Sequence, residues 1–266
     1  MRANISGYIP SKTNNSQTII YNTEDKLAIF ESLGVETVII TDFTTISHLE
    51  PWDFVKSVLI DIFDARIAIA GFNFRFGKGA AASAKDLSDM MQMQGRTAKI
   101  IDKQTLGGKT VSSTYIRTLL KEKRIEEATK FLGLPFFIHA KVEKGLGLGR
   151  GFGFPTVNSA IRSDLPLSPG VYRTAVKIGQ KLYTGITNIG SCPTVCKREV
   201  HSETLIADFD GNLYDSELKI FFLGYLREEK LFDSVDKLRK QIFLDKERSI
   251  KENGDLKWLA TGLNLQ

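Results

Sequence analysis

The pattern of the sequence changes at residue 135, and this change limits the fold more than any other feature. Before it, β-rich runs alternate with segments whose apolar residues recur at helical spacing, which predicts an α/β region built on a parallel sheet. After it, short strand-like runs follow one another with glycines between them, which is an all-β pattern. Closure into a small barrel hides the edges of such a sheet. We therefore predict an α/β domain over residues 1–134 and an all-β barrel with a C-terminal helix over residues 135–266.

Capping residues mark the ends of the predicted helices. The residues placed to begin helices are Thr23, Ser112 or Ser113, and Asp233 or Ser234. Gly34 and Gly133 are placed to end helices, because glycine adopts the left-handed conformation of a helix C-terminus. Leu33 is expected on the apolar face of the first helix.

Composition and charge narrow the class of protein. The chain has 266 residues, of which 42% are hydrophobic and 25% charged, as in globular proteins. Its net charge of +5 suits anionic ligands, but it has no block of Lys and Arg like a nucleic-acid-binding arm. We find neither a signal-peptide core nor the run of ~20 apolar residues that a membrane span needs.

The two cysteines, Cys192 and Cys196, are too few for a secreted disulfide scaffold, and their spacing with His201 matches no zinc template. We expect a cytoplasmic protein that acts on small molecules, without a nucleic-acid or membrane partner. The oligomeric state stays open.

Residues 145–158, GLGLGRGFGFPTVN, place a glycine at every second position before Pro155. No register of this stretch fits the dinucleotide fingerprint G-x-G-x-x-G, and the chain has no Gly-Lys-Ser/Thr of a P-loop. Alternating glycines let the backbone approach a ligand and form an anion-binding nest, to which Arg150 adds charge. Thr156 and Asn158 face the same side of an extended strand and offer the oxygen ligands that Mg²⁺ prefers. We interpret the stretch as a Mg²⁺–nucleotide site, with a ligand-free glycine-rich hairpin as the alternative.

The end of this stretch, GRGFGFPTVN, resembles the Gly-Arg-x-x-Gly-Phe-Pro-Thr-x-Asn signature of riboflavin kinases. Further similar segments follow in the family's order: LPLSPGVY (165–172), NIG (188–190) and ETLIADFDGNLY (203–214). The resemblance covers the second half of the chain. It implies ATP-dependent phosphorylation of riboflavin to FMN on a six-stranded barrel.

The resemblance also implies roles for individual residues. Thr156 and Asn158 would hold Mg²⁺ with the nucleotide phosphates, Glu203 would accept the proton of the ribityl hydroxyl, and Arg227 would lie on the flavin side. The residues implied in ATP binding are Gly147, Gly149, Arg150, Gly151, Gly153 and Pro155. The chain departs from the family pattern at Cys192, Leu205 and Asp215, which lie near the site. A flavin-binding regulatory protein without catalysis is therefore an alternative.

The first half resembles the FMN adenylyltransferase domain of bacterial bifunctional FAD synthetases, through GFNFRFGK (71–78) and VSSTYIR (111–117). The nucleotide-site residues that this resemblance implies are Asn73, Ser112, Ser113, Thr114 and Arg117. A helix start carrying serines and an arginine suits phosphate binding. The family's His-x-Gly-His stretch does not occur in the sequence, whose three histidines are isolated. We predict a degenerate domain with weak or no adenylyltransferase activity, and a bifunctional FAD synthetase is the alternative.

Overall fold

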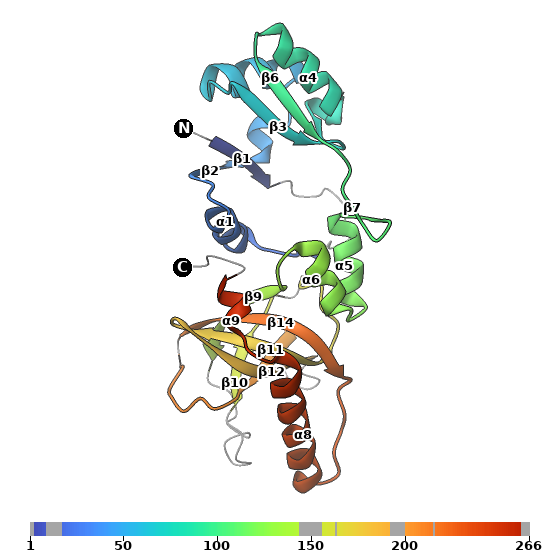
Figure 1. The fold of residues 1–266 in the computed structure, drawn as a ribbon. Helices are drawn as coiled ribbons and strands as arrows, with labels where there is room; N and C mark the ends of the chain where they lie inside the picture. The colour runs from blue at the N-terminus through green and yellow to red at the C-terminus, as the bar shows by residue number, and fades with distance from the viewer. Residues whose placement is uncertain are drawn as a thin grey trace. The chain divides into compact units, whose positions relative to one another are not determined.

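The computed structural model describes residues 3–8, 18–143, 156–162, 164–191, 200–214 and 216–261, with backbone alone at 3–8, 191, 200, 201, 260 and 261 (Figure 1). By their contacts, the residues form two compact units. The first comprises residues 1–15 and 27–111, and the second comprises residues 16–26 and 112–266. Residues 18–26 and 112–134 thus cluster with the barrel. The domain boundary that the sequence indicated after residue 134 stays a prediction.

The first unit is an α/β region with parallel strand pairs, as predicted. Strand β1 (Ala3–Tyr8) pairs with β2 (Thr37–Asp42), and β3 (Ile67–Gly71) pairs with β6 (Thr97–Ile101), both in parallel. The smaller elements are α2 (Phe43–Ile46), β4 (Arg75–Phe76), η2 (Lys78–Ala80), β5 (Ala82–Ser83), β7 (Thr105–Leu106) and β8 (Lys109–Thr110). The helix expected from Trp52 begins as α3 (Pro51–Asp53) and continues as the π-helix η1 (Phe54–Ile62).

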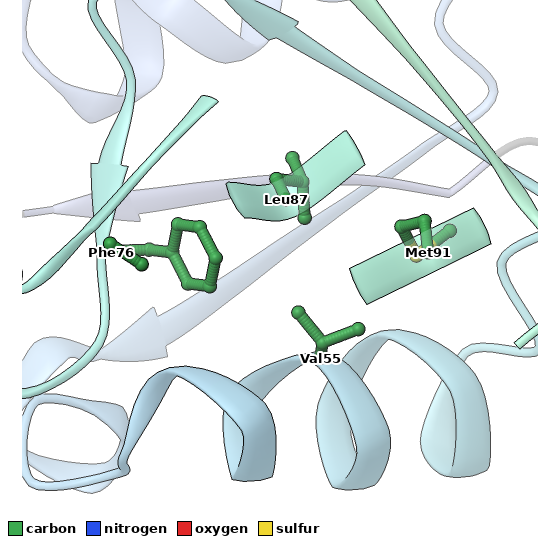
Figure 2. Packing of buried hydrophobic residues seen from close by; sticks show 5 residues of the cluster. Val55, Phe76, Leu87 and Met91 are labelled. Carbon is green, nitrogen blue, oxygen red and sulfur yellow. The ribbon is translucent and has the colours of Figure 1, made fainter. Parts of the chain in front are cut away.

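The core of this unit forms where η1 and helix α4 (Ala84–Met93) come together. Figure 2 shows Val55 of η1 opposite Leu87 and Met91 of α4, with Phe76 beside them. Val55 and Met91 are fully buried. The alternation of the parallel strands explains which residues join this core, because Ala68 of β3 packs on it whereas Ile69 is exposed.

The second unit contains a closed six-stranded antiparallel barrel, in the strand order β10-β13-β12-β11-β14-β9, which confirms the predicted fold. Its strands are β9 (Phe137–Glu143), β10 (Thr156–Ala160), β11 (Gly170–Ile178), β12 (Lys181–Ser191), β13 (Val200–Ile206) and β14 (Glu217–Arg227). Closure pairs every strand on both sides, so the strands that the structure describes form no open sheet edge. The helices of this unit are α5 (Ser113–Lys121), α6 (Ile125–Leu132), α8 (Val235–Asn253) and α9 (Lys257–Thr261).

Polar side chains hold the barrel interior and the helix α8. The hydroxyl of Thr187 lies 3.0 Å from those of Thr174 and Thr204, and all three residues are fully buried. The C-terminal part of helix α8 packs against β11 and β12 (Figure 1). Ser249 Oγ donates to the carbonyl of Gly185, and Asn253 Nδ2 donates to that of Thr174, each at 2.9 Å. These bonds tie α8 to the backbone of β12 and β11.

Most helix ends follow the sequence, and two expectations at the first helix are wrong. Helix α1 (Thr23–Ser32) is capped by Asn22, whose Oδ1 accepts from the Asp25 N–H at 2.7 Å while Asp25 Oδ2 receives the Asn22 N–H at 3.4 Å. Thr23 already lies inside the helix, so it cannot be the cap. Leu33 lies beyond the last helical turn and is exposed by 70%.

Three other helix ends are confirmed. Ser112 caps α5 and Ser234 caps α8 through their side-chain oxygens, and Gly133 ends α6 in the left-handed conformation.

In the described part of the chain, no helix combines the length and the apolar character that crossing a membrane requires.

Candidate active site on the barrel surface

Glu203 lies in a row of polar residues that crosses four neighbouring strands. On β13 it pairs with Asn158 of β10 on one side and with Asn188 of β12 on the other. Asn158 in turn pairs with Glu143 of β9. Residues directly opposite each other in antiparallel strands carry their side chains on the same face of the sheet. We call Glu143, Asn158, Glu203 and Asn188 the polar row.

The residues predicted to bind the metal lie beside Glu203. Thr156 is two positions before Asn158 on β10, so both side chains are on the face of the polar row. Both residues are half-buried. A hydroxyl, an amide oxygen and nearby carboxylates are the hard oxygen donors that Mg²⁺ takes, so this donor set fits the predicted ion.

Glu203 is exposed, whereas its neighbours Ser202 and Thr204 are fully buried, because successive strand residues point to opposite faces. Among the residues that the structure describes, none forms a hydrogen bond or ion pair with Glu203. A carboxylate without a partner in the protein keeps its acceptor oxygens for a substrate hydroxyl.

Asn188 has one paired and one unpaired group. Its Nδ2 donates to Glu229 Oε1 at 3.1 Å, while its Oδ1 is buried and finds no partner among the described residues. Gly190 permits this approach of Glu229, since a Cβ there would lie 2.5 Å from Glu229 Oε1. The sequence assigned no role to Asn188, Glu229 or Glu143. Only the NIG segment pointed to Asn188, and nothing in the sequence places the three beside Glu203.

Arg227, predicted on the flavin side, ends β14 and pairs with Val171 of β11. Its Nε and Nη2 donate to Asp245 Oδ2 of α8 at 2.9 and 2.8 Å. Gln241 Nε2 donates to the other oxygen of Asp245 at 2.9 Å. Arg227 therefore ties the barrel to helix α8, and its contact with flavin stays a prediction.

Two family models match this chain, one in each half. The riboflavin kinase model matches residues 132–252, and the FAD synthetase model matches residues 8–115. The bifunctional riboflavin kinase/FMN adenylyltransferase of Buchnera aphidicola is 33% identical over 87% of this chain and 76% of its own length. The chain belongs to this bifunctional family. The Bacillus subtilis member is 29% identical over 94% of this chain and 80% of its own length.

A solved structure has the same fold. The crystal structure of a Streptococcus pneumoniae protein, described as a macrolide-efflux protein, superposes with a TM-score of 0.84 at 26% identity. The match covers 95% of this chain and 84% of that one. The likeness therefore extends over both the α/β region and the barrel.

Several predicted site residues lie outside the described residues. These are the ATP-loop residues Gly147, Gly149, Arg150, Gly151, Gly153 and Pro155, and the departures from the family pattern Cys192 and Asp215. The third departure, Leu205, is buried and pairs with Thr156.

The predicted adenylyltransferase residues divide between the two units. Asn73 lies in an exposed turn of the first unit, whereas Ser112, Ser113, Thr114 and Arg117 begin α5 in the second. Ser112 accepts the Tyr115 N–H at 3.2 Å as the helix cap, and Arg117 Nε donates to the carbonyl of Thr18 at 2.7 Å. Nucleotide binding by these residues stays a prediction.

Proposed function

We propose that this protein phosphorylates riboflavin at its 5′-hydroxyl with Mg–ATP to give FMN, on the barrel face that carries the polar row. The in-register pairing of Asn158 with Glu203 is the observation that supports this most directly. The amide of Asn158, the proposed metal ligand, thus lies on the strand next to a carboxylate that has no partner among the described residues. A kinase needs both groups side by side, because the phosphates and the attacking hydroxyl must meet.

Each residue has a defined task in this reaction. Thr156 and Asn158 would hold Mg²⁺, which would supply positive charge against the nucleotide phosphates. Glu203 accepts the proton of the 5′-hydroxyl as the new oxygen–phosphorus bond forms and the bond to the β-phosphate oxygen breaks, which releases ADP. The exposure of Glu203 leaves room for the ribityl chain to reach it.

The test is FMN formation by the full chain supplied with riboflavin and Mg–ATP, with Glu203→Gln as the decisive variant. This change keeps the side-chain volume and removes the base, so we expect kcat to fall about a hundredfold or more. Glu217→Gln is the matched control, because Glu217 is also an exposed strand glutamate but lies on β14 opposite Lys141. An unchanged kcat in Glu203→Gln would disprove the assigned base.

The match of residues 8–115 to the FAD synthetase model supports a second candidate activity, transfer of AMP from ATP to FMN. The sequence contains no His-x-Gly-His stretch, which in the family supports the charge on the transferred group. We therefore keep the prediction that this chain forms little or no FAD.

We place the protein in the cytoplasm, because two cysteines suit a reducing compartment. Its proposed partners are ATP, riboflavin and FMN, without nucleic acid.

A further inference from the structure

Strand β10, which carries both proposed metal ligands, has the fewest paired residues among the described parts of the barrel strands. It is five residues long, whereas the other five strands have seven to eleven. All five residues pair with β13, whereas among the described residues Asn158 and Ser159 alone pair with β9. The positions of Thr156 and Asn158 therefore depend on what holds the chain where it leaves this strand.

A segment from the beginning of the chain holds this exit. Arg162, two residues after β10, donates through Nη2 to the carbonyl of Ile19 at 2.7 Å and to that of Ile20 at 3.3 Å. The Ile19 N–H donates to the carbonyl of Asp164 at 3.0 Å. We call residues 18–25 the strap. It clusters with the barrel, although it lies more than a hundred residues before the part that matches the riboflavin kinase model.

The strap is itself firmly attached at both ends. At its start, Arg117 Nε of α5 donates to the Thr18 carbonyl at 2.7 Å. At its end, Asp25 is only 3% exposed, and its Oδ1 lies within hydrogen-bond distance, 2.6 Å, of His139 Nδ1 of β9.

Aromatic stacking fixes the middle of the strap. The ring of Tyr21 lies 5.7 Å from that of Phe136 and 4.9 Å from that of Phe137, and Tyr21 is 8% exposed. Anchors on α5 and β9 make the strap a rigid support for the exit of β10.

We propose that Arg162 is a positioning residue of the phosphoryl transfer, which fixes Thr156 and Asn158 by tying the exit of β10 to the strap. This inference rests on the function proposed above. Arginine suits this task because its planar guanidinium presents several N–H donors in a fixed geometry and can bind two carbonyls at once. Lysine also has several N–H donors, but they rotate on a flexible stem without the planar geometry of the guanidinium, so it holds the two carbonyls less firmly.

The experiment measures the Mg²⁺ concentration for half-maximal rate, and KM separately for Mg–ATP and for riboflavin, in the full chain. We expect Arg162→Ala to raise the Mg²⁺ requirement and KM for Mg–ATP about tenfold, with KM for riboflavin changed less than about twofold. Arg162→Lys should recover only part of the loss. A general loss of structure would instead lower the active fraction without separating the two KM values.

A change on the strap itself provides an independent test. Tyr21→Ala removes the stacking on β9 without touching Arg162, and it should produce the same selective rise in KM for Mg–ATP. Both changes act through the strap. The rise in KM for Mg–ATP in the double variant should therefore be much smaller than the two single effects combined. If Arg162→Ala does not fold, the Mg²⁺ requirement and KM for Mg–ATP are compared in Arg162→Lys and Tyr21→Ala instead.

Two controls separate this inference from the proposed function. Arg96→Ala removes an arginine of the first unit that also donates to a backbone carbonyl, that of Asp64, and should leave all three constants unchanged. Asn158→Ala tests the metal site directly. If Asn158→Ala raises the Mg²⁺ requirement while the Arg162 and Tyr21 variants do not, the role of Arg162 is wrong and the proposed function stands. If Asn158→Ala also leaves it unchanged, the metal site itself is wrong.

Discussion

Asn158 and Glu203 lie directly opposite each other on β10 and β13, although 45 positions separate their residue numbers in the chain. Directly opposed side chains on antiparallel strands interact, so a change at either residue can affect the other. The proposed metal binding and proton acceptance are therefore best tested by single variants together with the double variant.

The metal site is tested by Thr156. Thr156→Ala removes the proposed hydroxyl ligand, so we expect the Mg²⁺ concentration for half-maximal FMN formation to rise about tenfold or more. Thr156→Ser keeps the hydroxyl and should stay within about threefold of the wild type. Equal Mg²⁺ curves for the Ala and Ser variants would argue against a hydroxyl ligand.

The ion pair between Arg227 and Asp245 should be a stability element. Asp245 has 7% of its side chain exposed and Arg227 has 16%. Arg227→Met leaves a nearly buried carboxylate without its cation, so we expect the free energy of unfolding to fall by about 2–4 kcal/mol in urea titrations. Lys237→Met breaks the exposed pair with Asp233 and should cost less than about 1 kcal/mol. Equal losses would mean that burial does not distinguish the two pairs.

Gly185 should tolerate no side chain. A Cβ there would lie 2.8 Å from Thr174 Oγ1 and 3.1 Å from Val176 Cγ2, inside a closely packed barrel. Gly185→Ala should lower the free energy of unfolding by about 1–3 kcal/mol through overpacking. Adding Thr174→Ala removes the nearest atom, so the double variant should be more stable than the sum of the single changes predicts. Strict additivity would contradict the steric cause.

Lys219 should make stability depend on pH. Burial, with the charge of Lys177, lowers the pKa of Lys219 to about 8 from its ordinary 10.5, against an opposing effect of Asp25. Between these values the unfolded chain binds more protons than the folded one, so the free energy of unfolding rises with pH across pH 8 to 10.5. Below pH 8, Lys219 is protonated in both states, so its unfavourable contribution to the free energy of unfolding no longer changes with pH.

Urea titrations of wild type and Lys219→Met across this range provide the measurement. The difference between the two proteins should shrink or change sign as the pH rises, since the variant carries no amine at this position. A difference independent of pH would show that Lys219 titrates at the same pH in both states.

Product analysis tests the first half of the chain. With FMN and Mg–ATP supplied, we expect FAD formation far slower than FMN formation from riboflavin, because the sequence has no His-x-Gly-His. Chromatography of both reactions under the same conditions compares the rates. FAD formation as fast as FMN formation would favour the bifunctional alternative.

Local patterns predicted the architecture well. Glycine-separated strands indicated a barrel, and Ser112, Ser234 and Gly133 marked helix ends that the structure confirms. The first helix was read less well, because Asn22 and Thr23 are both good caps and their choice depends on Asp25 closing the capping box.

The sequence indicated which residue types carry the chemistry of the site, but not which residues lie next to one another. Motif similarity pointed to Thr156, Asn158 and Glu203, but strand register decides which neighbours they meet, and register depends on pairing between distant segments. Asn188 and Glu143 were missed for this reason. Arg162 was missed because its partners, the carbonyls of Ile19 and Ile20, carry no side-chain signal.

The strap also bears on how the protein forms during synthesis. Ile19 leaves the ribosome long before Arg162, its partner 143 positions later. The strap therefore cannot bind the barrel until residues as far as Arg162 have been synthesised. Contacts between such distant positions close late, because the intervening loop loses much conformational entropy. The native position of the strap should thus be among the last features to form on the ribosome.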